Sequence, residues 1–365
     1  MSNDRAIQRL PAELAYQEEL VRLAAADSSP KPEGWRMSPL AVEAFVLGDS
    51  ERKTEAKFVA ERTLVRRIIV SLCTNRGCLL VGEPGTAKSW LSELIAAAVS
   101  GDSTLTLQGG AVNQVNQLLY SWNGAVLASK GPCPEALVPS PLLRGMQAGQ
   151  LVRFEELARC PQSLQDALLS VLSDRVAVIP ELAGAEGVVH ARAGFNVIGT
   201  ANSVDAGLFQ MSAALKRRMD FEEIRPISRI DDEIAVVQRE LAKSNRQAGV
   251  DVPPDDSVLE VLVTMFHELR NGQSLDGRST DRLSGASLST AEAVSVAHAT
   301  SLNAWYYGDG RMTIEQLMNH IVGSALKDHP EDRRRLMHYF ETEVAQRDGS
   351  HWQELYRHRN LLKGL

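Results

Sequence analysis

The stretch "GCLLVGEPGTAKSWLSELIAAAV", residues 77–99, places a glycine-rich loop between an apolar run and an amphipathic pattern. The apolar run at 77–82 predicts a short buried strand, and the leucine spacing after the loop predicts a helix. Glycines let backbone amides turn toward a phosphate, and the start of the following helix adds partial positive charge. The sequence therefore predicts a phosphate-binding loop at residues 82–89.

The loop supplies the groups that a nucleotide site needs. Lys88 is expected to reach the β- and γ-phosphates of ATP, and the Ser89 hydroxyl to bind Mg²⁺. Ala87 stands at a position where such loops commonly carry glycine. The residues expected to contact the nucleotide are Gly82, Glu83, Pro84, Gly85, Thr86, Ala87, Lys88, Ser89 and Trp90.

A second strand candidate, "LVRF" at 151–154, is followed by two adjacent acids, Glu155 and Glu156. Side chains alternate along a strand, so the two carboxylates are expected on opposite faces at its carboxyl end, where open α/β sheets bind ligands. Glu155 is then a candidate for holding Mg²⁺, and Glu156 for polarising the attacking water.

Polar residues later in the chain complete this order of features. The apolar run "FNVIGT" at 195–200 predicts another strand, and Asn202 just after it is suited to holding the attacking water. Two arginines, Arg217 and Arg218, follow near the end of the α/β region. Each feature is weak alone, but phosphate loop, acid pair, asparagine and arginines in this order indicate an ATPase.

The pattern of elements predicts an α/β domain followed by a helical one. Strand candidates, with a further one at 103–108, alternate with helices, which is typical of a parallel sheet covered on both faces. After residue 227 only helical patterns remain, at about 231–244, 255–270, 289–306, 313–327 and 330–346. The predicted parts are an N-terminal helical extension and linker (1–56), the nucleotide-binding domain (57–226), an all-α lid (227–346) and a C-terminal tail (347–365).

Composition limits the possible location and partners. The formal net charge is −7, and charges of both signs are interspersed, which argues against general affinity for nucleic acid. The N-terminus has no apolar signal core, and no run approaches the roughly 20 apolar residues of a membrane span. We therefore expect a cytoplasmic protein.

These motifs together resemble the AAA+ ATPases, and within them the MoxR family, over about residues 57 to 330. "LLVGEPGTAKS" (79–89) resembles a Walker A motif, and "GQLVRFEELARCPQSLQDALLSVLSDR" (149–175) resembles Walker B with its helix. "VIGTANSVDAG" (197–207) is similar to sensor 1, and "ALKRRMDF" (214–221) to the stretch that carries the arginine finger.

The resemblance implies roles for several residues. Glu156 would activate water, Asn202 would be the sensor 1 residue, and Arg218 would act as a finger in a neighbouring subunit, with Arg217 as the alternative. It also implies an AAA+ fold, Mg-ATP as cofactor and a homo-oligomer, expected to be a hexamer. MoxR proteins typically act on proteins that carry a von Willebrand factor type A domain.

Three residues depart from the family pattern. Glu155 replaces an aspartate, Arg153 interrupts a strand that is normally apolar, and Ser289 stands where the family often has a sensor 2 arginine. Arg278 or Arg282, in the loop before it, is a candidate substitute.

Arg153 allows two interpretations, because an unpaired guanidinium inside a sheet would cost several kcal/mol. It can form a structural pair with an acid on a neighbouring strand or helix. It can also pair with Glu155, which shares its face two residues on, and slow turnover by tuning that carboxylate.

The leading hypothesis is an oligomeric ATPase that remodels a protein partner. Two stretches, 121–136 and 178–194, are expected to project from the core, the second as a hairpin. A nucleic-acid motor is an alternative, although these stretches contain only Lys130 and Arg192 as basic residues, and phosphate tracking needs several. A nucleotide-gated scaffold that scarcely hydrolyses ATP is another alternative.

Overall fold

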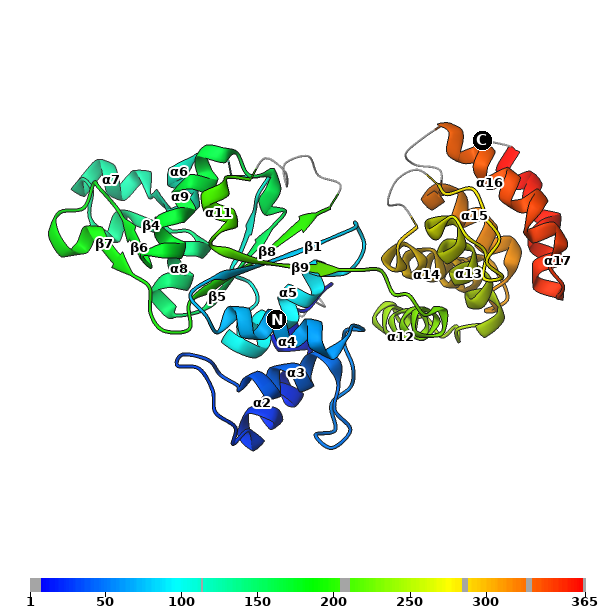
Figure 1. Ribbon diagram of the computed structural model, residues 1–365, viewed down its shortest axis with the longest axis horizontal. Coiled ribbons are helices and arrows are strands. Elements are labelled where there is room, and N and C mark those ends of the chain that lie inside the picture. The colour runs from blue at the N-terminus through cyan, green and yellow to red at the C-terminus, as the bar shows by residue number, and fades with distance from the viewer. Residues whose placement is uncertain (1–7, 113, 204–210, 284–287, 326–329, 364–365) are drawn as a thin grey trace, which may run out of the picture. The chain divides into compact units, whose positions relative to one another are not determined.

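The computed structural model describes residues 8–112, 114–203, 211–283, 288–325 and 330–363. The chain divides into two compact units, one of Met1–Gly82 with Lys88–Ile224 and one of Glu83–Ala87 with Arg225–Leu365. The division after Ile224 lies close to the predicted boundary at residue 226. Figure 1 shows an α/β unit and a helical unit, as predicted.

A five-stranded parallel sheet forms the centre of the first unit, in the order β2-β5-β8-β1-β9. Its strands are β1 (Gly77–Gly82), β2 (Thr106–Gln108), β5 (Leu151–Glu155), β8 (Asn196–Asn202) and β9 (Met219–Ile224). The predicted parallel sheet is confirmed. The edge strand β9 was not predicted from the sequence. Only its first and last residues, Met219 and Ile224, are buried, because an edge strand has a neighbouring strand on one side alone.

Helices cover both faces of this sheet (Figure 1). Leu80 belongs to the core with α3, α4 and α5, whereas its neighbour Leu79 belongs to the core with α8 and α9. This alternation along β1 follows from the pleat of a strand buried on both sides. The covering helices are α3 (Pro39–Leu47), α4 (Arg62–Leu72), α5 (Lys88–Ser100), α8 (Pro141–Ala148) and α9 (Gln162–Ser173).

The N-terminal region is part of the first core rather than an appendage. It contains two helices, α1 (Ala12–Ala15) and α2 (Gln17–Ala26), separated at Tyr16, whose φ is −121°. The helix α3, within the predicted extension and linker, buries Phe45 completely. The buried residues Ala12 and Leu23 join the same cluster as α4 and α5.

The first unit also contains two small antiparallel strand pairs. The predicted hairpin at 178–194 is confirmed as β6 (Val176–Val178) paired antiparallel with β7 (Val188–His190). In the other expected projection, β3 (Tyr120–Trp122) pairs with β4 (Leu137–Pro139) around α7 (Gly124–Lys130). The remaining short elements are α6 (Val115–Leu119), η1 (Pro134–Ala136), η2 (Leu157–Arg159), η3 (Gly184–Gly187) and α11 (Ala213–Lys216).

The second unit is helical, and all five helices predicted there are confirmed. They are α12 (Ile230–Ala248), α13 (Asp256–Asn271), α14 (Thr290–Tyr307), α15 (Ile314–Ala325) and α16 (Pro330–Thr342). The segment expected as a tail instead contains η4 (Val344–Gln346), α17 (Ser350–Arg357) and η5 (His358–Lys363). Leu355 and Leu362 are buried in the helical core, so this segment belongs to the lid.

Of the helices in the described ranges, none combines the length and the apolar character needed to cross a bilayer.

Candidate functional site

The phosphate loop connects the end of β1 to the start of α5, as predicted. Gly85 and Ala87 both have left-handed backbones, with φ of 76° and 58°. Glycine adopts this conformation freely, whereas alanine does so at a cost, and this explains why glycine is common at the Ala87 position. The Thr86 hydroxyl donates to the carbonyl of Glu83 at 2.9 Å, which closes the turn. Lys88 is buried, and its Nζ donates to the carbonyl of Gly82 at 3.0 Å.

The side chain of Trp90 does not face the loop. Its indole Nε1 donates to the carbonyl of Lys57 at 3.1 Å, and its ring centroid lies 6.3 Å from that of Tyr16. The indole therefore packs against the N-terminal helices, and a contribution of Trp90 to phosphate binding would come from its backbone.

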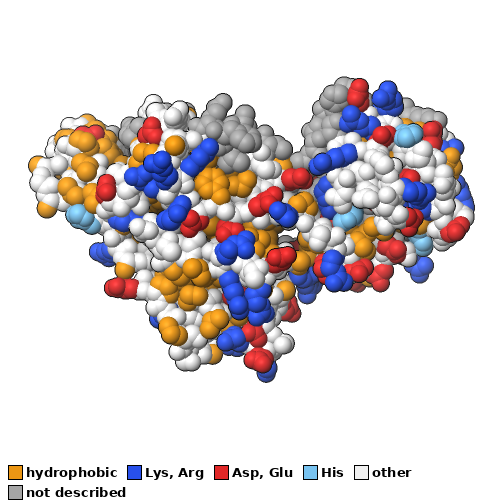
Figure 2. Space-filling model, viewed as in Figure 1, with side chains coloured by type: hydrophobic (Ala, Val, Ile, Leu, Met, Phe, Trp, Pro, Cys, Tyr) orange, Lys and Arg blue, Asp and Glu red, His pale blue; other side chains and the backbone are white. Residues whose placement is uncertain are grey.

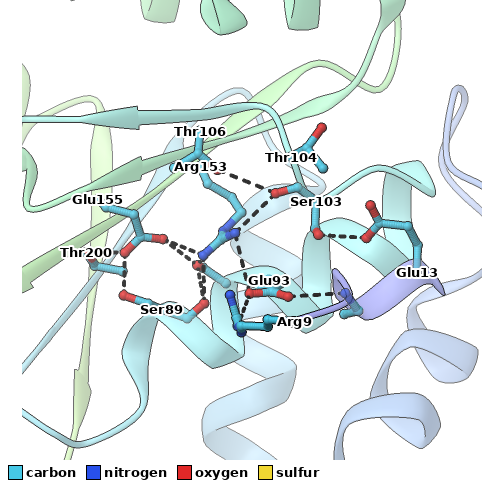
Figure 3. A network of polar contacts seen from close by, with 12 residues as sticks. Arg9, Glu13, Ser89, Glu93, Ser103, Thr104, Thr106, Arg153, Glu155 and Thr200 are labelled. Carbon is cyan, nitrogen blue, oxygen red and sulfur yellow. Dashed lines mark hydrogen bonds and ion pairs between the residues drawn. The ribbon is translucent and has the colours of Figure 1, made fainter. Parts of the chain in front are cut away.

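The carboxylate of Glu155 lies at the centre of a buried polar cluster (Figure 3). Its Oε2 accepts hydrogen bonds from the hydroxyls of Ser89 at 2.5 Å and Thr200 at 2.7 Å. Its Oε1 accepts from the Ser92 hydroxyl and from Arg153 Nη2, both at 2.9 Å. The end of β5, the first turns of α5 and strand β8 thus converge on this carboxylate beside the phosphate loop.

The Glu155 carboxylate is ionised at neutral pH. Burial alone would raise its pKa, but hydrogen bonds from Ser89 and Thr200, the charge of Arg153 and a hydrogen bond from Ser92 together outweigh burial and lower the pKa below its usual range. A charged oxygen is therefore held next to the Ser89 hydroxyl.

Arg153 forms both of the predicted kinds of ion pair, one with an acid on a neighbouring helix and one with Glu155. It contacts Glu155 on its own strand, and its Nη1 lies 3.7 Å from Oε2 of Glu93 on helix α5. Its Nε donates to Ser92 Oγ at 3.0 Å, and its two terminal nitrogens also donate to carbonyls of the chain. The guanidinium is thus fully paired inside the unit, and its effect on turnover stays a prediction.

Glu156 is separated from Glu155 by a change of backbone conformation. The strand ends at Glu155, and Glu156 is left-handed, with φ 54° and ψ 42°. A left-handed non-glycine residue costs on the order of 1 kcal/mol and is frequent at functional sites. The Glu156 carboxylate is partly exposed and lies 3.0 Å from Nη1 of Arg159, while its N–H donates to Thr200 Oγ1 at 3.1 Å.

Asn202 ends β8 and lies in register with Gly82, the first residue of the phosphate loop. The next residue, Ser203, donates its N–H to the Gly82 carbonyl at 3.0 Å. Asn202 is therefore next to the loop, as expected for a residue that holds the attacking water, although that role stays a prediction.

The two candidate finger arginines differ in their surroundings. Arg218 donates from Nη1 to the carbonyl of Ala214 at 3.0 Å and from Nε to the hydroxyl of Ser173 on α9. Arg217 follows α11 directly, and its side chain is exposed. Exposure makes Arg217 as good a candidate as Arg218 for reaching another molecule.

In the lid, Ser289 has a local structural role. It is the N-cap of α14, and its hydroxyl accepts the N–H of Glu292 at 3.3 Å. Arg278, one candidate substitute for a sensor 2 arginine, lies 2.9 Å from Glu343 within the lid.

Three members of the Glu155 cluster were not predicted from the sequence, namely Ser92, Glu93 and Thr200. Ser92 lies one helical turn after Ser89, and Thr200 precedes Asn202 by two residues on one strand, so both spacings were visible. Glu93 gave no local signal, because its link to Arg153 depends on how α5 packs against β5.

The residues present fit Mg²⁺. Mg²⁺ prefers oxygen ligands and typically takes one or two carboxylates together with substrate phosphates. The Ser89 hydroxyl and the ionised Glu155 carboxylate, in contact at the start of α5, are such ligands. They would hold the ion beside the phosphate loop.

Two family descriptions cover most of the chain. Residues 77–219 match the AAA domain of the dynein-related subfamily, and residues 231–363 match the YehL-like AAA+ ATPase C-terminal domain.

The chain is similar to curated proteins and to solved structures. It is 47% identical over 357 residues to the uncharacterized protein YehL of Escherichia coli (strain K12), covering 98% of both chains. It is 24% identical over 196 residues to the uncharacterized protein SH1500 of Staphylococcus haemolyticus (strain JCSC1435), covering 54% of this chain and 69% of that protein. The structure of NtrX from Brucella abortus in complex with ADP has a TM-score of 0.50 and 15% identity, covering 97% of this chain and 73% of NtrX, and supports the fold alone. The chain belongs to the YehL family, and it combines an AAA domain of the dynein-related subfamily with a YehL-like AAA+ ATPase C-terminal domain.

Proposed function

We propose that this chain hydrolyses Mg-ATP in a homo-oligomeric ring, expected to be a hexamer, and uses the cycle to remodel a protein partner. The observation that carries the proposal is the contact between the Ser89 hydroxyl and the Glu155 carboxylate at 2.5 Å, directly after a phosphate loop. A hydroxyl and an ionised acid at this place are the two protein groups that a Mg-ATP site needs.

Different residues bind the phosphates, hold the metal ion and activate the attacking water. Lys88 Nζ turns from the Gly82 carbonyl to the β- and γ-phosphates, and Ser89 and Glu155 hold the metal side of the nucleotide. When bound, Mg²⁺ supplies charge that offsets the phosphate oxygens. Glu156 takes a proton from the water that Asn202 orients. The water oxygen bonds to the γ-phosphorus, the bond to the bridging oxygen breaks, and ADP and phosphate leave.

Exposed Arg217 and its neighbour Arg218 support a site shared between subunits. A finger must leave its own surface to enter a neighbour's site, and an arginine supplied in trans can be worth about 10³–10⁵ in rate. Arg218 is the residue that the family resemblance favours, and Arg217 is the more accessible of the two.

The surface of the first unit supports a protein partner over a nucleic acid. Val138, Val178 and Val188, on β4, β6 and β7, are exposed. Figure 2 shows hydrophobic side chains where Figure 1 places these hairpins, and acidic and basic side chains lie among one another on the same face. An apolar projection suits protein contact, whereas phosphate tracking needs a basic groove. The MoxR-like assignment, with a von Willebrand factor type A protein as partner, rests on the resemblance of the motifs.

A nucleotide-gated scaffold with little hydrolysis is the second candidate. It is favoured by the four protein donors that already occupy the Glu155 carboxylate. Each of these hydrogen bonds must be weakened or shared before Glu155 acts on anything else.

Nucleotide binding and hydrolysis of the full chain test the proposal. We expect Lys88→Ala to lose most ATP affinity, because Lys88 is the only lysine or arginine in the loop sequence 82–89. We expect Arg218→Ala to bind ATP but lose turnover, and mixing it with Glu156→Gln subunits to restore part of the activity. Arg217→Ala is measured beside it, because Arg217 would be the finger if only its variant lost turnover.

Two outcomes would overturn the proposal. ATP affinity that survives in Lys88→Ala would remove the binding site. Turnover that is unchanged in both arginine variants and independent of protein concentration would remove the shared site.

A further inference from the structure

The N-terminal segment Arg9–Ala15 reaches the Glu155 cluster through Glu93. Glu93 is on α5 and is buried, with 2% of its surface exposed. Its Oε1 accepts the backbone N–H of Ala12, the first residue of α1, at 3.1 Å. Its Oε2 accepts from Arg9 Nη2 at 2.7 Å and lies 3.7 Å from Arg153 Nη1. Glu93 is therefore shared between the N-terminal segment and the arginine that pairs with Glu155.

A second connection runs through Ser103. Its carbonyl accepts from Arg153 Nη1 at 3.1 Å, and its hydroxyl donates to Glu13 Oε2 at 2.6 Å. Figure 3 shows Arg153 between Glu155 on one side and Glu93 and Ser103 on the other. The N-terminal segment thus contacts both groups that hold Arg153 on the side away from Glu155.

The docked segment fixes the groups that hold Arg153. It brings one cation, Arg9, to Glu93 and one acid, Glu13, to Ser103, so it adds no net charge. Without Arg9 and the Ala12 N–H, buried Glu93 would have Arg153 as its remaining charged partner. Glu93 and Ser103 would then lose the contacts that fix their positions, so Arg153 would be held less firmly against Glu155.

We propose that Arg153 and Glu93 are positioning residues that make the Glu155 carboxylate depend on docking of the N-terminal segment Arg9–Ala15. Docking holds Arg153 against Glu155 Oε1 and leaves Oε2 directed at Ser89. Release of the segment loosens Arg153, lets the carboxylate turn, and weakens the Mg²⁺ dependence of nucleotide binding. The proposal rests on the proposed Mg-ATP site, and it needs no particular rate of hydrolysis.

The test measures how much Mg²⁺ strengthens binding of a fluorescent ATP analogue. The affinity is measured by titration with Mg²⁺ and again with EDTA, for the full chain and its variants. Arg9→Ala removes an exposed side chain, so we expect the ratio of the two affinities to fall by only about threefold. Glu93→Gln removes a buried charge, and we expect a fall of about tenfold. The double variant should fall no further than Glu93→Gln, because both changes act on one connection.

Arg22→Ala is the matched control. Arg22 is an exposed arginine on α2 that donates to the carbonyls of Arg52 and Lys53, outside the network. Its loss should leave the affinity ratio unchanged. Arg9 has a side chain that is 70% exposed, so Arg9→Ala keeps the test valid even if Glu93→Gln unfolds.

The outcomes separate this inference from the proposed function. An unchanged affinity ratio in Arg9→Ala and Glu93→Gln overturns the inference, as does an equal loss of affinity with and without Mg²⁺. Absent turnover in the wild type would count against the proposed hydrolysis, while the ratio would still decide the inference. Wild-type protein that binds no ATP would overturn both.

Discussion

Each unit of the chain buries a glutamate against an arginine and hydroxyl groups. In the first unit Glu155 accepts from Arg153 and three hydroxyls. In the lid, Glu233 accepts from both terminal nitrogens of Arg270, at 3.0 and 2.8 Å, and from the Thr290 hydroxyl at 2.7 Å. The two carboxylates are similar in burial and in the kinds of groups that donate to them.

The two clusters differ in what their donors otherwise do. The partners of Glu233 lie on α13 and α14, and Arg270 also donates to the carbonyl of Leu288 at 2.9 Å, before the start of α14. That cluster joins three helices. Among the partners of Glu155 is Ser89, which directly follows the phosphate-loop lysine at the carboxyl end of the sheet. A buried glutamate–arginine pair is thus no sign of catalysis by itself. Its position at the carboxyl ends of the strands is what indicates a ligand site.

The largest expected effect is the loss of ATP turnover when Glu156, the acid next to Glu155, is changed. Glu156→Gln removes the base but leaves Ser89, Glu155 and Lys88 in place, so ATP should bind and turnover should fall by about 10²–10⁴. Single-turnover hydrolysis of wild type and variant measures this, and trapped ATP should stabilise the assembled ring. Equal rates in wild type and variant, whether both are rapid or both near zero, would show that Glu156 is not the base.

A smaller effect is expected in the lid, and it should appear in stability. Burial raises the pKa of Glu233, but hydrogen bonds from His267, Arg270 and Thr290 and the charge of Arg270 outweigh it and bring the pKa to about 2. A lowered folded-state pKa stabilises the protein above the unfolded-state value, and this stability is lost as pH falls through the folded value. Glu233→Gln should therefore cost about 3 kcal/mol of unfolding free energy at pH 7.

Urea unfolding of wild type and Glu233→Gln at several pH values measures that difference. The gap should narrow as the pH falls from about 5 toward 2, because wild-type Glu233 then gains its proton. Glu240→Gln, on the same helix but partly exposed, is the control and should change stability little. A pH-independent gap would mean that the ionised form of Glu233 is not what stabilises the lid.

The sequence predicted features that depend on local pattern. The strand at β1, the phosphate loop and the lid helices follow from apolar spacing and glycine positions within short windows. Strand β9 was missed because "MDFEEI" is half charged, as an edge strand can be, and reads as a loop. The last helix, α17, was missed because "HWQELYRH" carries few apolar residues, although Leu355 is buried.

Contacts within one strand or loop of the site were predictable from the sequence, whereas contacts that depend on tertiary packing were not. Glu155 and Arg153 share a face two residues apart, so their contact followed from strand geometry. The link from Arg153 to Glu93 and on to Arg9 joins residues far apart in the chain, and no local pattern predicts it. The direction of the Glu156 side chain was predicted from the alternation of side chains along a strand. Glu156 has a left-handed backbone instead, so that alternation does not apply to it.

The next prediction concerns the length of the acid in the first cluster. Glu155→Asp shortens the side chain by one methylene, so it cannot keep all four donors at their present distances. The shorter acid restores the aspartate that the family resemblance implies at this position, and with it the usual metal geometry. We expect single-turnover hydrolysis to rise by roughly threefold, the equivalent of one modest hydrogen bond. Glu155→Ala, in contrast, should weaken Mg²⁺-dependent binding, and a slower Glu155→Asp would mean that the glutamate is the better fitted acid.

The smallest expected effect concerns Ala87 in the phosphate loop. Its φ of 58° is left-handed, and relieving this conformation with glycine is worth about 1–2 kcal/mol. Glycine also gains backbone freedom in the unfolded chain, which offsets roughly 0.5–1 kcal/mol of that relief. Ala87→Gly should therefore raise the unfolding free energy by only about 0.5 kcal/mol. Lys53, exposed and at φ 51°, is the matched position outside the loop, and Lys53→Gly should give a similar gain in urea unfolding. A gain at Lys53 with a loss at Ala87 would show that the alanine methyl group, and not only the backbone, is fitted to the phosphate loop.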